Sequence, residues 1–245
     1  MKKENTSVID SSSVLEIIKF NTGRIRFNAN LKKKYFDSKM AKSQLIQNIA
    51  ITLQFFTGLR INEIAKLEFS QLELLSKKKP IKVVLSKLKN RVVRNIAINP
   101  TLKSGQLLYK QLIKMLKSFL QLNQDFLVVS KNMNSKKTII KKKNGKTYET
   151  SFFPYISYFL IGVNSVLKRF VEKKDSENDS FLPSHIEKMT SHGFRNNFIV
   201  TAYKSFGNDL VRTQKLIGHY SIDMTSKYIY KYLSSQDGMN FKFAI

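Results

Sequence analysis

The chain has 245 residues, 42% of them hydrophobic, which is enough for one core of good size. It has 43 lysines and arginines against 17 acidic residues, a formal charge of +26, and such a domain repels itself unless it binds a polyanion such as nucleic acid. No cysteine is present, which excludes a disulfide framework and a zinc finger. A lysine-rich composition without functional meaning is the competing interpretation of the charge.

The hydrophobic spacing predicts mainly helices, several of which begin at serine or aspartate capping residues. Residues 21–36 are ambiguous between loop and short strand. The acidic run at residues 172–180 is interpreted as a solvated connecting loop, and Pro154 as a break near the start of a helix. The expected helices cover residues 11–20, 38–57, 61–67, 104–120, 152–170, 192–203, 209–217 and 224–232.

Two stretches rich in β-branched residues predict antiparallel hairpins. The first pairs residues 81–85 with residues 92–98 around a basic SKLKN turn. The second lies within residues 128–150, is rich in lysine and turns at Asn144-Gly145, a strong turn dipeptide. We therefore expect a mainly α chain with a small antiparallel β-hairpin or sheet, an α+β fold.

Basic residues are unevenly distributed along the chain. Twelve lysines and arginines, and no acidic residue, lie between Glu73 and Asp125. A solvated helix face usually mixes both signs, whereas stretches of one sign suit a phosphate backbone. We expect double-stranded DNA to contact such stretches. The candidate contact residues are Lys89, Arg91, Lys141, Lys142 and Lys143.

No apolar run is long enough to span a bilayer, and the N-terminus lacks the apolar core of a signal peptide. We expect a cytoplasmic or nucleoid-associated protein without a membrane partner.

Four short motifs are informative only as an ordered set. A TGLR turn can carry an ordinary surface arginine, and a histidine or tyrosine in an apolar helix is usually a core residue. Their combination in this order and spacing is much harder to attribute to chance. The motifs are TGLR at 57–60 followed by Glu63, the basic hairpin turn with Lys87 and Lys89, SHGFR at 191–195, and Gly218-His219 followed nine residues later by Tyr228.

Together the motifs resemble those of the tyrosine recombinases, the family of phage integrases and Xer-type recombinases. The resemblance covers roughly residues 10–235 and rests on FFTGLRINEIAKL, the basic hairpin, SHGFR and KLIGHYSIDMTSKY. It implies the catalytic-domain fold of that family, with insertions near residues 128–150 and 172–180. Residues 1–9 and 236–245 would be tails.

The resemblance implies a site-specific recombinase or integrase that breaks and rejoins DNA through a 3′-phosphotyrosyl intermediate, with neither a metal nor another cofactor. Tyr228 would be the nucleophile. Arg60 and Arg195 would neutralise the phosphate, because a guanidinium can bind two of its oxygens at once. The protein would assemble into a tetramer on DNA.

The remaining polar residues of the motifs would serve proton transfer and orientation. By resemblance, Lys87 would protonate the leaving 5′-hydroxyl, and His192 would assist proton transfer from the tyrosine. His219 would donate a further hydrogen bond to the phosphate. Glu63, one helical turn after Arg60, either orients that arginine or forms a plain helix salt bridge.

Two assignments have competitors. Tyr228 competes with three other tyrosines, but residues two apart on a helix differ by about 200°, so Tyr228 and Tyr230 cannot share a face. The family spacing selects Tyr228. Lys87 competes with Lys89, and that choice stays open. The other competing tyrosines are Tyr220 and Tyr232.

The chain also departs from the family pattern. Ile217 stands where the family usually has leucine, and Asn196-Asn197 follow Arg195 where a histidine and a threonine are common. Only 59 residues precede Arg60, so we expect either a short recombinase or a catalytic fragment that lacks the N-terminal DNA-clamping domain. A type IB topoisomerase and a non-catalytic basic DNA-binding protein are the alternative functions.

Overall fold

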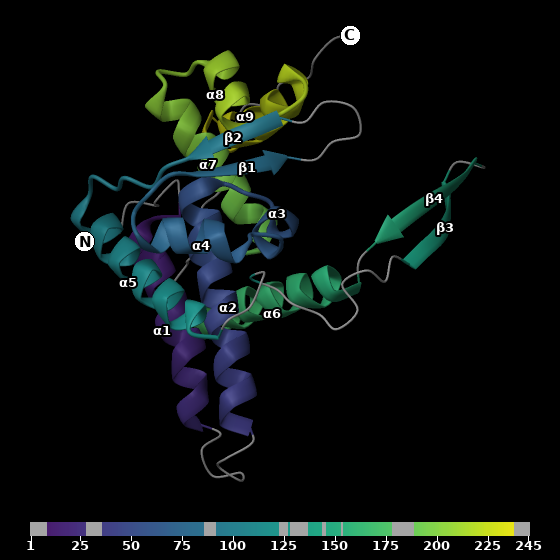
Figure 1. The fold of residues 1–245 in the computed structure, drawn as a ribbon. Coiled ribbons are helices and arrows are strands. Elements are labelled where there is room, and N and C mark those ends of the chain that lie inside the picture. The colour runs from purple at the N-terminus through teal and green to yellow at the C-terminus, as the bar shows by residue number, and fades with distance from the viewer. Residues whose placement is uncertain are drawn as a thin grey trace.

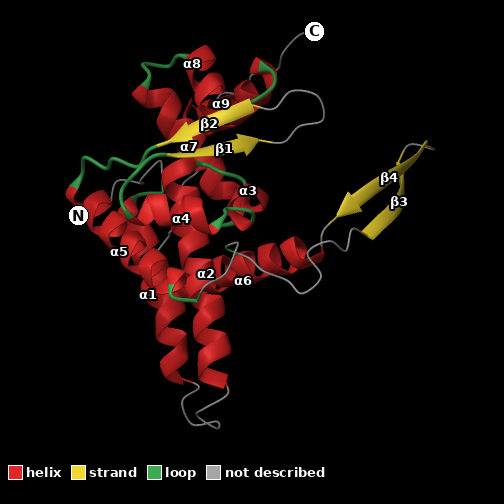
Figure 2. Cartoon of the chain, viewed as in Figure 1, coloured by secondary structure: helices red, strands yellow, loops and turns green. Residues whose placement is uncertain are grey.

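The computed structural model describes residues 9–27, 36–85, 92–122, 127, 137–143, 146–152, 154–177 and 189–237. These residues are mainly helical, with two separate two-stranded antiparallel sheets (Figure 1, Figure 2), which confirms the predicted fold class. In chain order the elements are α1 Ser11–Phe27, α2 Phe36–Thr57, α3 Ile61–Ala65, α4 Phe69–Ser76, β1 Ile81–Leu85, β2 Val92–Ile96, α5 Lys103–Leu120, β3 Lys137–Lys143, β4 Lys146–Phe152, α6 Pro154–Ser176, α7 Ser191–Ser205, α8 Leu210–Ile217 and α9 Ile222–Asp237.

Helix α2 is the centre of the larger core. It contacts α1, α3, α5, α6 and α7, and Figure 1 shows it running alongside α1 through the body of the molecule. Seven consecutive residues, 48–54, are buried on it, as expected for a helix surrounded by others rather than lying at the surface. The C-terminal end of α2, where the predicted arginine motif begins, is thereby held between α7 and Arg94 of β2.

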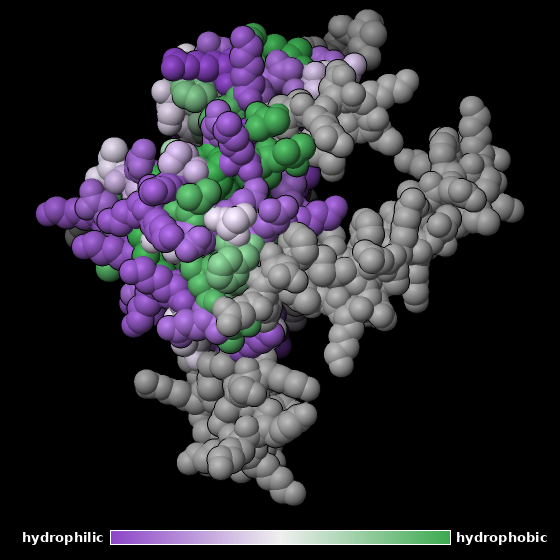
Figure 3. All heavy atoms as spheres, viewed as in Figure 1, coloured by the Kyte–Doolittle hydropathy of each residue, from purple (hydrophilic) through white to green (hydrophobic). Residues whose placement is uncertain are grey.

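The β1–β2 hairpin has one buried and one exposed face. Val83 pairs with Arg94 on the buried face, and Val84 pairs with Val93 on the other. The two outer valines are 53% and 54% exposed, and Figure 3 shows hydrophobic residues at the surface over these strands. Because successive side chains of a strand point to opposite faces, this register turns Arg94 inward.

Three expectations about helices were wrong in detail. Helix α1 continues to Phe27 and so includes part of the segment at 21–36 that was ambiguous. Asn21 of this helix donates a hydrogen bond to Asn48 of α2 at 2.8 Å, a buried contact that the local sequence cannot reveal. Helix α4 was not predicted, and it forms because it buries Leu72 and Leu75. Pro154 begins α6 instead of breaking it, since the first helical turn does not need the missing N–H.

The acidic run was expected to be a loop, but its first residues belong to α6, which ends at Ser176. Ion pairs one turn apart support the helix there: Lys168 with Glu172 at 3.5 Å and Lys173 with Glu177 at 3.6 Å. Lys174 also pairs with Glu16 of α1 at 2.9 Å. Residues 178–180 lie outside the described part.

The second predicted hairpin is confirmed by β3 and β4, which pair from Lys137 opposite Phe152 to Lys143 opposite Lys146. Figure 1 shows this hairpin standing away from the helical body, just before α6. Lys141, Lys142 and Lys143 lie on β3.

Helices α7, α8 and α9 pack together around a second, smaller core. Its buried members are Ile199, Val200, Ile217, Ile229 and Tyr232. None of the described helices is long and apolar enough to cross a membrane.

Candidate active site

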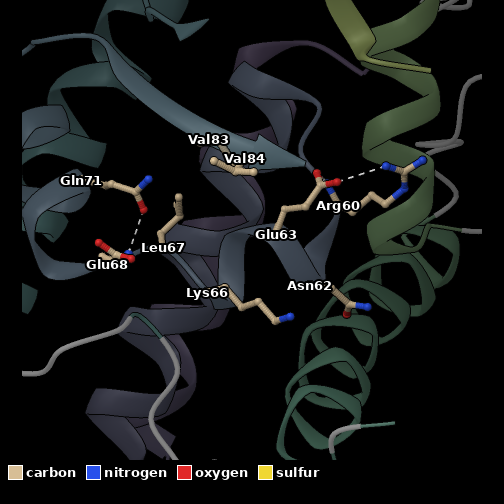
Figure 4. Close-up of a pocket in the computed structure, with 9 residues that line it drawn as sticks. All are labelled: Arg60, Asn62, Glu63, Lys66, Leu67, Glu68, Gln71, Val83 and Val84. Carbon is tan, nitrogen blue, oxygen red and sulfur yellow. Dashed lines mark hydrogen bonds and ion pairs between the residues drawn. The ribbon is translucent and has the colours of Figure 1, made fainter. Parts of the chain in front are cut away.

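The TGLR motif forms the turn between α2 and α3. Helix α2 ends at Thr57, and Gly58 adopts a left-handed conformation with φ of +61°. A Cβ at Gly58 would overlap the Phe198 ring of α7. Glycine is therefore required here both by backbone conformation and by the close approach of α7. This turn places Arg60 beside α7 (Figure 4).

Glu63 fixes Arg60 at two points. Its carboxylate accepts from the Arg60 backbone N–H at 2.7 Å and from Arg60 Nη1 at 3.0 Å. The predicted contact between these residues is thus present. The pair is partly buried, and it orients the arginine while leaving its other donors available for an anion.

Arg195 lies on α7 and is 1% exposed. Its Nη1 donates to the carbonyl of Gly58, which ties α7 to the TGLR turn. Nε and Nη2 have no hydrogen-bond partner among the described residues, although they form one bidentate edge of the guanidinium. Burial, together with the charge of Arg60, lowers the pKa of Arg195 to about 10, so the group stays positively charged at neutral pH.

His219 follows α8 on a glycine cap. Gly218 has φ of +71°, and its N–H donates to Gln214 at 2.9 Å, closing the helix in a left-handed cap. His219 is 5% exposed, and its Nδ1 is hydrogen-bonded to the Thr225 hydroxyl at 2.8 Å. Thr225 is wholly buried on α9. This contact sets the orientation of the imidazole.

Tyr228 lies against both histidines. Its hydroxyl is 3.2 Å from His192 Nε2, and its ring stacks on His219 with centroids 5.6 Å apart and planes at 20°. Tyr220 and Tyr230 are 78% and 51% exposed. Tyr232 packs in the smaller core instead. Of the four competing tyrosines, Tyr228 is therefore the one next to the motif histidines and Arg195.

His192, in the first turn of α7, is poised to accept a proton. Desolvation, followed by the positive charges of Arg195 and Arg60, lowers its pKa below the ordinary imidazole value. The neutral form therefore dominates at neutral pH, and in the tautomer that carries its proton on Nδ1, Nε2 can accept a proton from the Tyr228 hydroxyl.

A hollow of about 350 Å³ flanks the site between α3, α4 and β1. Figure 4 shows Arg60 and Glu63 at one end of it and Glu68 and Gln71 at the other. Neither the motif histidines nor Tyr228 line it. Of the candidate site residues that the structure describes, Arg60 and Glu63 thus line this hollow, whereas His192, His219 and Tyr228 do not.

Sequence reasoning missed two residues that the structure brings to the site. Thr225 could have been noticed, because it lies one helical turn before Tyr228. Arg94 could have been noticed because a period of two places it on the same strand face as Ile96. Its Nη2 donates to the Thr57 carbonyl at 2.9 Å.

Some predicted residues cannot be placed. Lys87, Lys89 and Arg91 lie outside the described residues. The choice between Lys87 and Lys89 therefore remains a prediction.

The model of the phage integrase family matches residues 26–234, which is most of the chain. No curated protein sequence matches it significantly. Among solved structures, the Tn1549 transposon integrase in complex with a circular intermediate DNA is similar at 19% identity and a TM-score of 0.47. That alignment covers 93% of this chain and 62% of that one.

The same integrase in complex with transposon right end DNA is similar at 16% identity and a TM-score of 0.49, covering 97% of this chain and 68% of that one. The chain thus spans about two thirds of these structures. The family match extends from within α1 to within α9 and includes all the motif residues. This protein belongs to the phage integrase family.

Proposed function

We propose that this chain is the catalytic part of a site-specific recombinase or integrase that breaks and rejoins DNA strands through a 3′-phosphotyrosyl bond to Tyr228. The observation that carries the proposal is the contact of the Tyr228 hydroxyl with His192 Nε2, beside the buried Arg195. A tyrosine next to a neutral imidazole and a cationic phosphate site is suited to attack phosphorus.

In the proposed cleavage step, the Tyr228 oxygen bonds to the scissile phosphorus while the bond from phosphorus to the 5′-oxygen breaks. His192 accepts the phenolic proton. Arg60 and the bidentate edge of Arg195 neutralise the charge that grows on the non-bridging oxygens. The leaving oxygen takes a proton from Lys87, and rejoining runs these transfers in reverse.

His219 and Glu63 support this step without exchanging atoms with DNA. His219, oriented by Thr225, directs its other ring nitrogen to a non-bridging oxygen and packs against the nucleophile's ring. Glu63 holds the Arg60 rotamer, which reduces the ordering cost when DNA binds. No metal takes part in these steps.

Double-stranded DNA is the proposed substrate, and strand exchange requires four copies on two duplexes. Residues 10–235 would form the catalytic domain. The β3–β4 hairpin, with Lys141, Lys142 and Lys143, is a candidate arm for DNA contacts outside the cleavage site. Lys89 and Arg91 would bind the backbone near the scissile phosphate. The protein would therefore be located inside the cell, where it would act on DNA.

A covalent-adduct assay tests the central claim. The substrate is a nicked duplex containing the inverted repeats expected beside the coding sequence, so that cleavage releases a short strand and traps the protein on DNA. Wild type and Tyr230→Phe should form the adduct, and Tyr228→Phe should not, because it lacks the attacking oxygen. An adduct that persists in Tyr228→Phe would refute the choice of tyrosine.

Two alternative functions predict different results. A type IB topoisomerase would relax supercoiled plasmid as a monomer without a defined site. A non-catalytic DNA-binding protein would shift the nicked duplex in a gel but form no adduct. The proposed recombinase instead joins two duplexes that carry its repeats.

A further inference from the structure

The three carbonyl groups that precede Arg60 each accept a hydrogen bond from a side chain. The TGLR turn follows the C-terminal end of α2, where carbonyl oxygens lack helical partners and carry partial negative charge. Three long side chains from three different elements satisfy them. Arg94 of β2 donates to the Thr57 carbonyl at 2.9 Å, Arg195 of α7 to the Gly58 carbonyl, and Gln54 of α2 to the Leu59 carbonyl at 3.4 Å.

The burial of the Arg94 guanidinium is energetically unfavourable. It is 6% exposed on the inner face of the hairpin, where Ile81, Val83 and Ile96 are also buried. Its Nη1 has no hydrogen-bond partner in the described part of the chain. Burying a guanidinium with so little compensation is unfavourable, and an apolar side chain would serve packing alone better. The position therefore indicates a task other than filling the core.

The charged side chains around Arg94 are those of the proposed phosphate site. The charge of Arg94 interacts with those of Arg60 and Glu63, and also with that of Arg195. Among the described residues, the charges of Arg60, Arg94 and Arg195 thus all interact with one carboxylate, that of Glu63. This carboxylate already forms an ion pair with Arg60. This cationic cluster is matched to an anion that gains negative charge during the reaction, as a phosphodiester does.

We propose that Arg94 is a positioning residue of this active site, one that fixes the TGLR turn through the Thr57 carbonyl and so sets both phosphate-binding arginines. Arg60 extends from the end of that turn. The neighbouring Gly58 carbonyl orients Arg195 through Nη1, which leaves Nε and Nη2 without a partner among the described residues and available for the phosphate in the proposed reaction. Arg94 itself does not contact the reacting phosphate. This inference rests on the proposed function.

The test compares Arg94→Met, Arg94→Gln and Arg94→Lys with the wild-type chain on the nicked repeat duplex. The matched control is Arg169→Met, which removes an exposed arginine of α6 that binds only its own helix in the described contacts. At saturating protein, Arg94→Met should form adduct about 10- to 100-fold more slowly, because small misplacements of phosphate-binding groups have effects of that size. DNA affinity should be unchanged, and Arg94→Lys should recover part of the rate.

A modified substrate separates this role from leaving-group protonation. When sulfur replaces the 5′-bridging oxygen, the leaving thiolate needs no proton, so Lys87→Ala should regain its rate while Arg94→Met stays slow. Recovery of Arg94→Met on this substrate would overturn the inference. So would a wild-type rate for the folded fraction of Arg94→Met, which indicates a role in stability alone.

If Arg94→Met does not fold, the Gln and Lys variants decide. Each keeps a donor that could reach Thr57, but neither reproduces the guanidinium, so both should form adduct more slowly than the wild type. If the wild type forms the adduct and the Arg94 variants form it at the wild-type rate, this inference is refuted but the proposed function is not. No adduct from wild type would count against the proposed function and the inference together.

Discussion

The turn that carries Arg60 and the helix that carries Tyr228 are held by different kinds of contact. Side chains from three elements bind the carbonyls of the turn, and the turn joins the larger core at the end of α2. Tyr228 lies on α9, whose buried residues belong to the smaller core of α7–α9. Its hydroxyl has one hydrogen bond among the described contacts, at 3.2 Å to His192.

This difference fits the two proposed tasks. Groups that stabilise a transition state are effective only if they are already in place, because reorganising them during the reaction costs free energy. A nucleophile must instead approach phosphorus, form a bond and later leave. We therefore expect disturbances of the turn to have larger consequences than comparable disturbances around α9.

The largest effect should come from Gly58→Ala. A left-handed alanine and its overlap with Phe198 should lower the free energy of unfolding by about 2–4 kcal/mol, measured by urea denaturation. The matched control is Gly207→Ala, which has φ of +64° but no atom within 4 Å of the added methyl group. Its cost should be about 1–2 kcal/mol from conformation alone. Equal losses in the two variants would contradict the close packing of the turn.

Hydrogen exchange should show the same contrast without a substitution. Amides of α8 and α9 should exchange sooner than those of α2 between residues 49 and 57, because the smaller core stabilises them less. The measurement is native-state exchange of the DNA-free protein followed by mass spectrometry. Equal protection of α9 and α2 would show that the two regions unfold as one unit.

Thr225→Val should have a moderate effect. It removes the hydroxyl that is hydrogen-bonded to His219 but keeps the side chain's shape, so adduct formation should slow about tenfold, equivalent to one lost hydrogen bond. Ser226→Ala is the control, since its exposed hydroxyl binds only the Ile222 carbonyl in the described contacts. If both variants retain the wild-type rate, Thr225 does not orient the histidine.

The smallest effect concerns the pKa of His192, which should lie below the ordinary imidazole value in the DNA-free protein. Arg60→Ala should raise it, because one neighbouring positive charge is removed. NMR titration measures both, with the signal assigned by its loss in His192→Gln. Adduct formation should therefore decline only when the pH falls below this lowered pKa, where protonated Nε2 can no longer accept the phenolic proton. A raised pKa in the wild type would contradict the assignment.

Local patterns predicted much of the fold and supplied the candidate site residues. Helical spacing and β-branched runs identified most elements, and the ordered motifs supplied five candidate residues that the structure brings together: Arg60, His192, Arg195, His219 and Tyr228. The errors lie where tertiary contacts override weak local signals. The extension of α1 depends on a buried amide contact with α2, and the helical acidic run depends partly on an ion pair between Lys174 and Glu16.

The sequence by itself determined which chemical groups this protein has and their order, because the motifs are local and need no packing to be recognised. Only the tertiary structure decided which groups meet. Arg195 reaches the Gly58 carbonyl across 137 residues of chain, and strand register turns Arg94 toward Thr57. Such contacts depend on how helices and strands pack, and packing is set by the whole core rather than by any single segment.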